Sequence, residues 1–227
     1  MELELISDPS CELCGLHAGA RNVCVPTLHY NILPSVPRAL VFIAQNPGHK
    51  EDELNEPLIG RSGQYVRKVL CGSSLDDSSP SLNNLLNIYF ANTARCATPP
   101  ETPPRDSHYK TCSSNYLYPE LDRIRAAHSE TMLICLGRPA SAYVWKYLTG
   151  SKGPGAVSAY TSLNGSSFPQ HTHFIATYHP AAMLRDRTYH ESIINHMRVA
   201  LDILMDRRPA VTTPHIIPPT SPSDWSP

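Results

Sequence analysis

Four short hydrophobic runs recur along the chain, separated by longer amphipathic or polar stretches. They cover residues 39–45, 88–92, 131–136 and 174–178. Each run is nearly continuous rather than alternating, which is typical of strands buried on both faces of a parallel sheet, although a short buried helix gives the same pattern. The flanking stretches favour strands, so the pattern predicts four of them.

The stretches around these runs place apolar residues at helical spacing. Helices are predicted at 62–71, 113–128, 139–148 and 189–205. Residues 150–170 are rich in Gly, Ser and Thr and are predicted as a loop or a small hairpin. Because strands alternate with helices, we expect an α/β fold with right-handed crossovers, in which three layers, α/β/α, enclose a central four-stranded parallel sheet.

The composition fits one folded domain followed by a different kind of segment. The chain has 227 residues, and one domain usually takes about 100–200. Of its 22 prolines, six lie within residues 209–227. Frequent proline with few apolar residues is typical of segments that do not pack. We therefore predict a folded unit at 1–208 and a disordered or extended tail at 209–227.

Charge and hydropathy exclude several classes of protein. No apolar run reaches the roughly 18 residues of a membrane span, so we expect no membrane partner. Lys and Arg number 19 against 20 Asp and Glu, a net charge of -1, so a polyanion has to bind at a local patch. Residues 1–10 are acidic and lack the apolar core of a secretion signal. We expect a monomeric protein of the reducing cytoplasm.

Polar residues follow each of the four predicted strands. They are residues 45–49 (QNPGH), Asn92, residues 137–138 and residues 179–180. Any one of these could be an ordinary turn. Ligands of an open parallel sheet bind beyond the carboxyl ends of its strands, however, so amide and imidazole groups at several strand ends face one crevice. The sequence therefore predicts a binding site at this edge.

Four of the seven cysteines form two pairs. Cys11 and Cys14 form a CxxC motif, and fifteen residues separate Cys96 from Cys112. Groups of four thiolates bind either zinc or an iron–sulfur cluster. In a reducing compartment a metal site is favoured over disulfides. The remaining cysteines, which are interpreted as ordinary buried thiols, are Cys24, Cys71 and Cys135.

Taken together, these motifs resemble the iron–sulfur branch, family 4, of the uracil-DNA glycosylase superfamily. The segment QNPGHKEDELNEPLIGRSGQ is similar to the first motif of that branch, a GEAPG-type turn followed by an acidic pair and a Pro-apolar-x-Gly stretch. HPAAMLR at 179–185 is similar to its second motif, and the two cysteine pairs match its cluster ligands. The resemblance extends from about residue 11 to 205 without rearrangement.

The resemblance implies a monofunctional DNA glycosylase, which hydrolyses the N-glycosidic bond of a flipped-out uracil or 5-modified pyrimidine and leaves an abasic site. Asn92 would pair with the polar edge of the flipped base through its amide. His179 would stabilise the negative charge that develops on O2 of the departing base.

The resemblance also assigns a cofactor and contacts with DNA. Its implied cofactor is a structural [4Fe-4S] cluster on Cys11, Cys14, Cys96 and Cys112, with zinc as the alternative. The DNA-binding residues that it implies are Arg61 and Ser62 at phosphate, and Met183, Leu184 and Arg185 as a wedge that enters the duplex.

The sequence departs from the branch at three positions. Gln45 replaces the usual Glu, and Asn46 replaces a small residue. The resulting QNPG resembles turns of the mismatch-specific and single-strand-selective glycosylases, in which Asn positions the attacking water, so both residues are assigned to catalysis. Leu58 replaces an aromatic that stacks on the base, and this loss leaves room for a larger one.

Gly48 stands where strictly uracil-specific relatives place a Tyr that excludes a 5-methyl group. A 5-modified pyrimidine, as in hydroxymethylated or glucosylated phage DNA, therefore stays open as the substrate, and its removal would make the protein a defence enzyme. A second alternative is a glycosylase-like DNA-binding module without catalysis, which the loss of the carboxylate at Gln45 favours.

Overall fold

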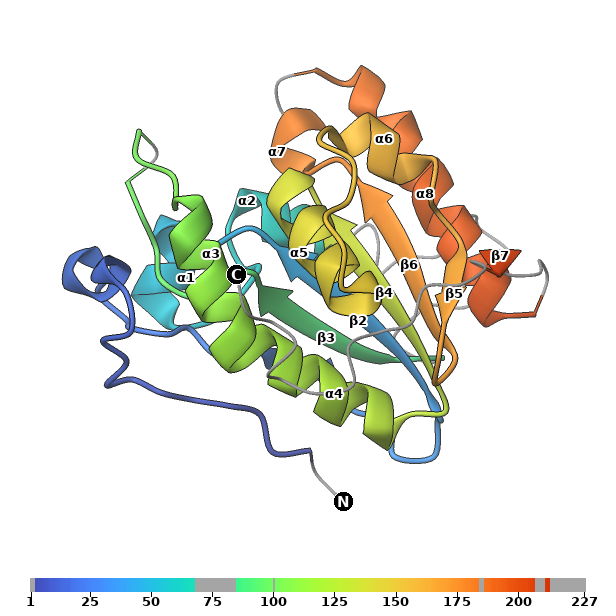
Figure 1. Ribbon diagram of the computed structural model, residues 1–227, viewed down its shortest axis with the longest axis horizontal. Helices are drawn as coiled ribbons and strands as arrows, with labels where there is room; N and C mark the ends of the chain where they lie inside the picture. The colour runs from blue at the N-terminus through green and yellow to red at the C-terminus, as the bar shows by residue number, and fades with distance from the viewer. Residues whose placement is uncertain (1–2, 68–84, 100, 184–185, 207–210, 213–227) are drawn as a thin grey trace.

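The computed structural model describes residues 3–67, 85–99, 101–183, 186–206 and 211–212 (Figure 1). Their strands form one sheet in the order β1-β3-β2-β4-β6-β5-β7. The four central strands, β3, β2, β4 and β6, run parallel, whereas β1 and β5 pair antiparallel at the two sides. The strands are β1 (Leu28–Asn31), β2 (Arg38–Ala44), β3 (Asn87–Asn92), β4 (Glu130–Leu136), β5 (Ser166–Phe168), β6 (Thr172–Thr177) and β7 (Val211–Thr212).

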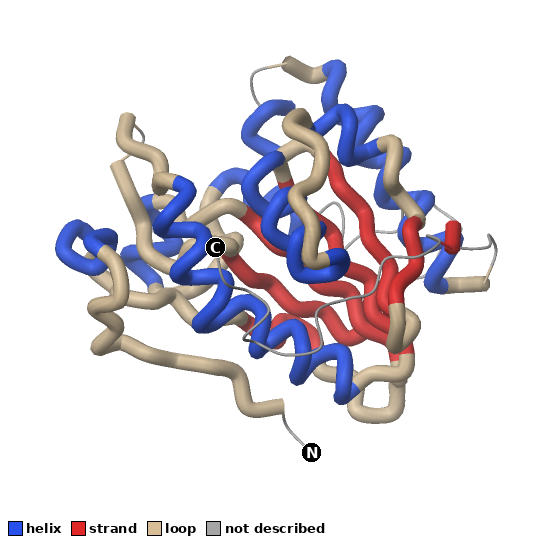
Figure 2. Tube along the Cα trace, viewed as in Figure 1, coloured by secondary structure: helices blue, strands red, loops and turns tan. Residues whose placement is uncertain are grey.

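Helices cover both faces of this sheet (Figures 1 and 2). One face packs against α3, α4, α5 and α6, and the other against α8 and the segment around α2. None of the described helices is long and apolar enough to cross a membrane. The helical elements are η1 (Gly15–Gly19), α1 (His49–Leu54), α2 (Arg61–Tyr65), α3 (Asp106–Cys112), the π-helical turn η4 (Ser113–Leu117), α4 (Tyr118–Ala127), α5 (Arg138–Thr149), α6 (Val157–Thr161), α7 (Pro180–Met183) and α8 (Thr188–Leu204).

Side chains of the central strands alternate between two hydrophobic cores. In β2, Val41 and Ile43 face the α3–α6 side, whereas Leu40 and Phe42 face α8, and all four are fully buried. A strand covered on both faces needs apolar residues at every position, which is why the runs in the sequence were continuous. The predicted α/β fold with a four-stranded parallel centre is confirmed.

The structure extends the predicted elements at several places. The helix expected at 113–128 begins at Asp106, because α3 runs through η4 into α4 without a break. Residues 150–170 contain α6 and then β5, which forms a hairpin with β6. The predicted helix at 62–71 is described as far as residue 67, so Cys71 lies outside the described residues.

The predicted tail at 209–227 is described only at β7, where Val211 and Thr212 pair with β5. The other residues of the tail lie outside the described part of the chain. The domain boundary at residue 208 therefore stays a prediction.

A buried ion pair ties the N-terminal segment to the sheet. Arg95, 1% exposed, lies just beyond β3 and pairs with Glu120 of α4, which is buried to the same extent. The guanidinium also donates to the Ile6 carbonyl and the Thr27 hydroxyl, both at 3.0 Å. Glu120 in turn accepts from the Ile6 peptide N–H at 2.7 Å. Each partner therefore supplies the counter-charge that the other needs in the core.

The variant Glu120→Gln should unfold more easily than wild type, because it leaves the buried guanidinium of Arg95 without a counter-charge. Breaking one side of a buried pair costs about 3–5 kcal/mol, which denaturant unfolding would measure. Glu53→Gln removes a carboxylate from a solvent-exposed pair with Lys50 and serves as the control, with no measurable change expected. Equal stability of the two variants would contradict this account.

Candidate active site

The carboxyl ends of the parallel strands meet in register at one edge of the sheet. Ala44, the last residue of β2, pairs with Asn92, the last of β3, and Leu136 of β4 pairs with Thr177 of β6. A backbone hydrogen bond beyond the strands keeps the ends of β2 and β3 together: the Thr93 N–H donates to the Ala44 carbonyl at 2.9 Å. Side chains that point to the same face from these ends can therefore meet in one crevice.

A cavity of 390 Å³ lies at this edge and contains most of the predicted site. It combines the turn after β2, the end of β3, the residue after β6 and the segment that leads into α2. The predicted site residues that line it are Asn46, Gly48, Leu58, Arg61, Ser62, Asn92 and His179. The structure thus brings together residues that span more than half of the sequence.

Asn92 presents an unused hydrogen-bond donor in this cavity. Its side chain is 3% exposed, and Nδ2 has no hydrogen-bond partner among the described residues. A buried amide without a partner costs free energy, and such groups in folded proteins often serve a ligand. Asn92 can therefore supply one donor and one acceptor to a planar polar edge.

His179 follows β6 and is held in one tautomer. The peptide N–H of Ala181 donates to Nδ1 at 3.2 Å, so Nδ1 is an acceptor and the neutral ring carries its proton on Nε2. Burial lowers the pKa of His179, and the charge of Glu51 partly opposes this effect. Gly137, with φ +87°, allows the close approach, because an added Cβ would stand 3.3 Å from the Cβ of His179.

Glu51 is a cavity residue that the sequence analysis did not assign. It lies in α1 and is 9% exposed, and Oε1 accepts the peptide N–H groups of Ile59 at 3.1 Å and Gly60 at 2.8 Å. Its carboxylate lies against Gly48, where an added Cβ would be 2.9 Å from Oε2. Glu51 and Asp52 are the acidic pair of the first motif, which could have indicated this residue. Only Glu51 contacts the cavity segment at 59–60, because the side chain of Asp52 points toward the N-terminal segment.

Asp52 holds the N-terminal segment through hydrogen bonds and does not line the cavity that contains Asn92 and His179. Its carboxylate accepts the peptide N–H groups of Arg21 at 3.0 Å and Asn22 at 2.9 Å. The side chain of Asn22 donates back to the Asp52 carbonyl. One short helix therefore anchors both the cavity and the segment that carries Cys11 and Cys14.

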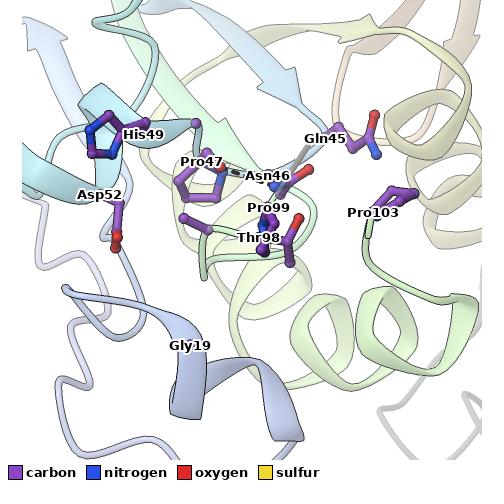
Figure 3. Close-up of a pocket in the computed structure, with 11 residues that line it drawn as sticks. Gly19, Gln45, Asn46, Pro47, His49, Asp52, Thr98, Pro99 and Pro103 are labelled. Atoms are coloured by element: carbon purple, nitrogen blue, oxygen red, sulfur yellow. Dashed lines mark hydrogen bonds between the residues drawn. The ribbon is translucent and has the colours of Figure 1, made fainter. Parts of the chain in front are cut away.

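Two of the other predicted site residues, Gln45 and Met183, do not line this cavity. Gln45 lines a neighbouring cavity (Figure 3). Its Nε2 donates to the Tyr109 hydroxyl at 2.6 Å, so the structure does not bring it together with Asn92 and His179. Met183 ends α7 and packs against the α8-side core. Leu184 and Arg185 lie outside the described residues.

Five cysteines gather near the N-terminal segment, all in the core on the α3–α6 side. Cys96 Sγ accepts the peptide N–H of Cys24 at 3.4 Å, and Cys112 Sγ accepts that of Arg95 at 3.3 Å. Burial raises the pKa of Cys112 to about 12, although the hydrogen bond from the peptide N–H of Arg95 partly opposes this effect. The other members of the group are Cys11 and Cys14.

These thiols suit iron or zinc chemically, because peptide N–H groups aimed at sulfur stabilise thiolates and tune clusters. All described cysteines are free. Among the described residues, no three His, Cys, Asp or Glu side chains stand in a finished coordination sphere. Cys24 was interpreted as an ordinary buried thiol, and its position beside Cys96 is new. Cys135, also so interpreted, is fully buried in β4.

A comparison with protein families decides the class of this fold and site. The model of the uracil DNA glycosylase superfamily matches residues 33–202. The chain belongs to the uracil DNA glycosylase superfamily. As a member of this superfamily it is a DNA glycosylase, which is a hydrolase that acts in DNA repair.

Curated relatives support the same branch that the motifs suggested. A type-4 uracil-DNA glycosylase of Archaeoglobus fulgidus is 27% identical over 180 residues, 77% of this chain and 78% of that protein. One of Thermotoga maritima is 23% identical over 190 residues, 82% of this chain and 85% of its own. One of Sulfurisphaera tokodaii is 26% identical over 185 residues, 77% and 71% respectively.

In this glycosylase the segment around Leu58 adopts a strained backbone. Leu58 is 4% exposed and has φ 52°, a left-handed conformation that bulky residues rarely adopt. Arg67 holds the segment by donating to the Leu58 carbonyl at 2.6 Å and the Pro57 carbonyl at 2.7 Å. Gly63 must stay small, because an added Cβ would overlap the Leu58 carbonyl group. The position that departs from the branch is thus fixed by its surroundings.

The lowered pKa of His179 predicts acid sensitivity of the glycosylase. The folded protein binds a proton at His179 less readily than the unfolded chain does, whose His pKa is about 6.5. The resulting stability is present above that pH and is lost as the pH falls through the lower pKa of the folded state. Between pH 7 and 5, wild type should therefore lose more unfolding free energy than His179→Gln. Parallel pH profiles in denaturant titrations would contradict the burial of a neutral ring.

Proposed function

We propose that this chain is a monofunctional glycosylase that removes a flipped-out uracil or 5-modified pyrimidine from DNA and leaves an abasic site. The observation that carries the proposal is the unpartnered Nδ2 of Asn92 in one cavity with His179 and Asn46. The relatives named uracil-DNA glycosylases support uracil as the reference base and DNA as the substrate.

Asn92 selects the base in this proposal. Its amide donor and acceptor pair with the polar edge of a pyrimidine that has left the stack, and the pairing repays the cost of burying the amide. An amide turned end for end offers the complementary pattern, so uracil and cytosine derivatives both remain compatible with it. Leu58 provides an apolar floor.

Hydrolysis breaks the bond between C1′ of the sugar and N1 of the base, and forms a bond from C1′ to a water oxygen. Negative charge develops on the base, where the Nε2–H of His179 is placed to donate to O2 without transferring a proton. Asn46 holds the water. The base finally takes up a proton from solvent, and the second proton of the water is released.

Glu51 supplies the carboxylate that Gln45 does not. The sugar becomes positively charged in the transition state, and a carboxylate in the same cavity stabilises that charge. Its two peptide N–H partners, at Ile59 and Gly60, hold it in place. Arg61 and Ser62, at the rim, contact the DNA phosphates in this proposal.

For the cofactor we propose a [4Fe-4S] cluster held by Cys11, Cys14, Cys96 and Cys112, with zinc as the alternative. Such a cluster would cross-link the N-terminal segment, the loop after β3 and the end of α3. Its role is structural, because hydrolysis transfers no electron.

Replacing the two polar catalytic groups should lower the rate more than the affinity. His179→Ala should reduce single-turnover excision of uracil from an oligonucleotide by about 10²–10³, the range for one lost oxyanion donor. Asn46→Ala should also reduce this rate, with DNA affinity retained. Asn92→Ala should weaken recognition of the target nucleotide as well, by about 1–3 kcal/mol.

The same assay separates catalysis from binding alone. Oligonucleotides with uracil, 5-hydroxymethylated or glucosylated pyrimidines, single-stranded and duplex, are incubated with protein and then with alkali, which cleaves abasic sites. If wild type, His179→Ala and Asn46→Ala release no base from any substrate while DNA binding persists, the proposal fails and the DNA-binding module replaces it.

Iron analysis of anaerobically purified protein tests the cluster. Wild type should contain about four iron atoms per chain and absorb broadly in the visible range. Cys112→Ser should lose iron, whereas Cys24→Ser and Cys135→Ser, which are buried thiols outside the proposed ligand set, should retain it. If the purified protein contains one equivalent of zinc and no iron, the cluster proposal is wrong and zinc is the bound metal.

A further inference from the structure

A second cavity, of 480 Å³, lies on the other side of the turn that follows β2. The two cavities share Asn46, Gly48 and His49 as wall residues. Figure 3 shows Gly19 of η1 across this second cavity from the Asn46–Pro47 turn and from Thr98 and Pro99. A group attached to a ligand in the first cavity could therefore reach the second by passing the shared turn.

The walls of the second cavity suit a neutral, hydroxylated group better than a phosphate. None of the 11 described residues that line it is Lys or Arg, and one of them is the acidic Asp52. Gln45, Asn46 and Thr98 offer uncharged donors and acceptors. Proline rings add flat apolar surface, at Pro47, Pro99 and Pro103. Amides, a hydroxyl and apolar C–H surface are complementary to a sugar or a hydroxymethyl group.

Gly48 lines both cavities. This residue is exposed and has no side chain. It must remain glycine while Glu51 holds its position, because an added Cβ would stand 2.9 Å from the Glu51 carboxylate. The position of the Glu51 carboxylate thus keeps a residue without a side chain in the wall that the two cavities share.

The proposed orientation of the base determines the side of the first cavity on which its C5 atom lies. C5 lies opposite C2 in the pyrimidine ring, so when O2 faces His179 a C5 substituent points away from His179. We propose that the second cavity is a specificity pocket for a hydroxyl-bearing C5 substituent, up to the size of one hexose, on the target pyrimidine. This inference rests on the proposed glycosylase function and names the substrate class that the site prefers.

Two glycines of η1 provide a matched pair of variants for the full-length protein. An added Cβ on Gly19 or on Gly15 meets no atom within 4 Å, so both positions accept a side chain. Gly19 lines the second cavity, whereas Gly15 lines only the surface hollow beyond it. Gly19→Tyr therefore adds bulk at the wall of the proposed pocket, and Gly15→Tyr is the control. Thr98→Tyr fills the same pocket from the facing wall if Gly19→Tyr does not fold.

Single-turnover excision is measured on matched oligonucleotides with uracil, 5-hydroxymethylcytosine or glucosylated 5-hydroxymethylcytosine. Wild type should release the hydroxylated bases, and Gly19→Tyr should slow release of the glucosylated base by about tenfold, equal to 1.4 kcal/mol. Release of uracil should stay unchanged in Gly19→Tyr, and Gly15→Tyr should match wild type on all three.

Three results would overturn the inference. If wild type releases uracil and neither hydroxylated base, the substrate class is wrong while the glycosylase function stands. If Gly19→Tyr and Thr98→Tyr slow all bases equally, the cavity holds the DNA strand instead of a base substituent. If no base is released from any oligonucleotide, the proposed function itself fails.

Discussion

The burial of one guanidinium organises the half of the molecule that carries the cysteines. Arg95 lies between Ala94 and Cys96 at the exit of β3, and its side chain reaches α4 and the N-terminal segment at once. Its backbone is used as well, since the peptide N–H contacts Cys112 Sγ and the carbonyl accepts Val25 N–H at 2.8 Å. A charge in the core tolerates few alternative arrangements. Segments distant in sequence are therefore held beside the same sulfur atoms.

Near the cavity of Asn92 and His179, two adjacent carboxylates of α1 face opposite directions. Glu51 serves the cavity and Asp52 serves the N-terminal segment, although both belong to the same short helix. The N-terminal segment that carries Cys11 and Cys14 and the cavity of Asn92 and His179 are thus connected through the backbone of α1.

Much of the site could be predicted because strands place residues by simple rules. The hydrophobic runs end where β2, β3 and β6 end, so Asn46, Asn92 and His179 were found at one edge. The position of Gln45 follows from the alternation of side chains along a strand. Ala44 and Asn92 face the α8 side, as does Asn46 beyond them, whereas Gln45 faces α3 and meets Tyr109. The separation of Gln45 from the cavity of Asn92 and His179 could therefore have been inferred from this alternation of side chains.

Other features depend on tertiary contacts that local patterns do not encode. Glu51 is buried only because the segment at 59–60 folds over it and offers two peptide N–H groups. Likewise, the strained backbone of Leu58 is stable only with Arg67 and Gly63 in place. Cys24 lies beside Cys96 with a φ of 56°, a left-handed conformation. Local sequence patterns do not predict this conformation for a cysteine.

The π-helical turn between α3 and α4 sets how the two parts of this long helix are oriented. It accommodates additional backbone within a continuous helix, so that Cys112 before it and Leu121 after it both face the core. Each residue of an α-helix advances about 100° around the axis. The length of the segment at 113–117 therefore sets the rotation of Cys112 relative to α4. A homologue that gained or lost one residue there would turn this cysteine away from the other cysteines while its α4 stayed packed on the sheet.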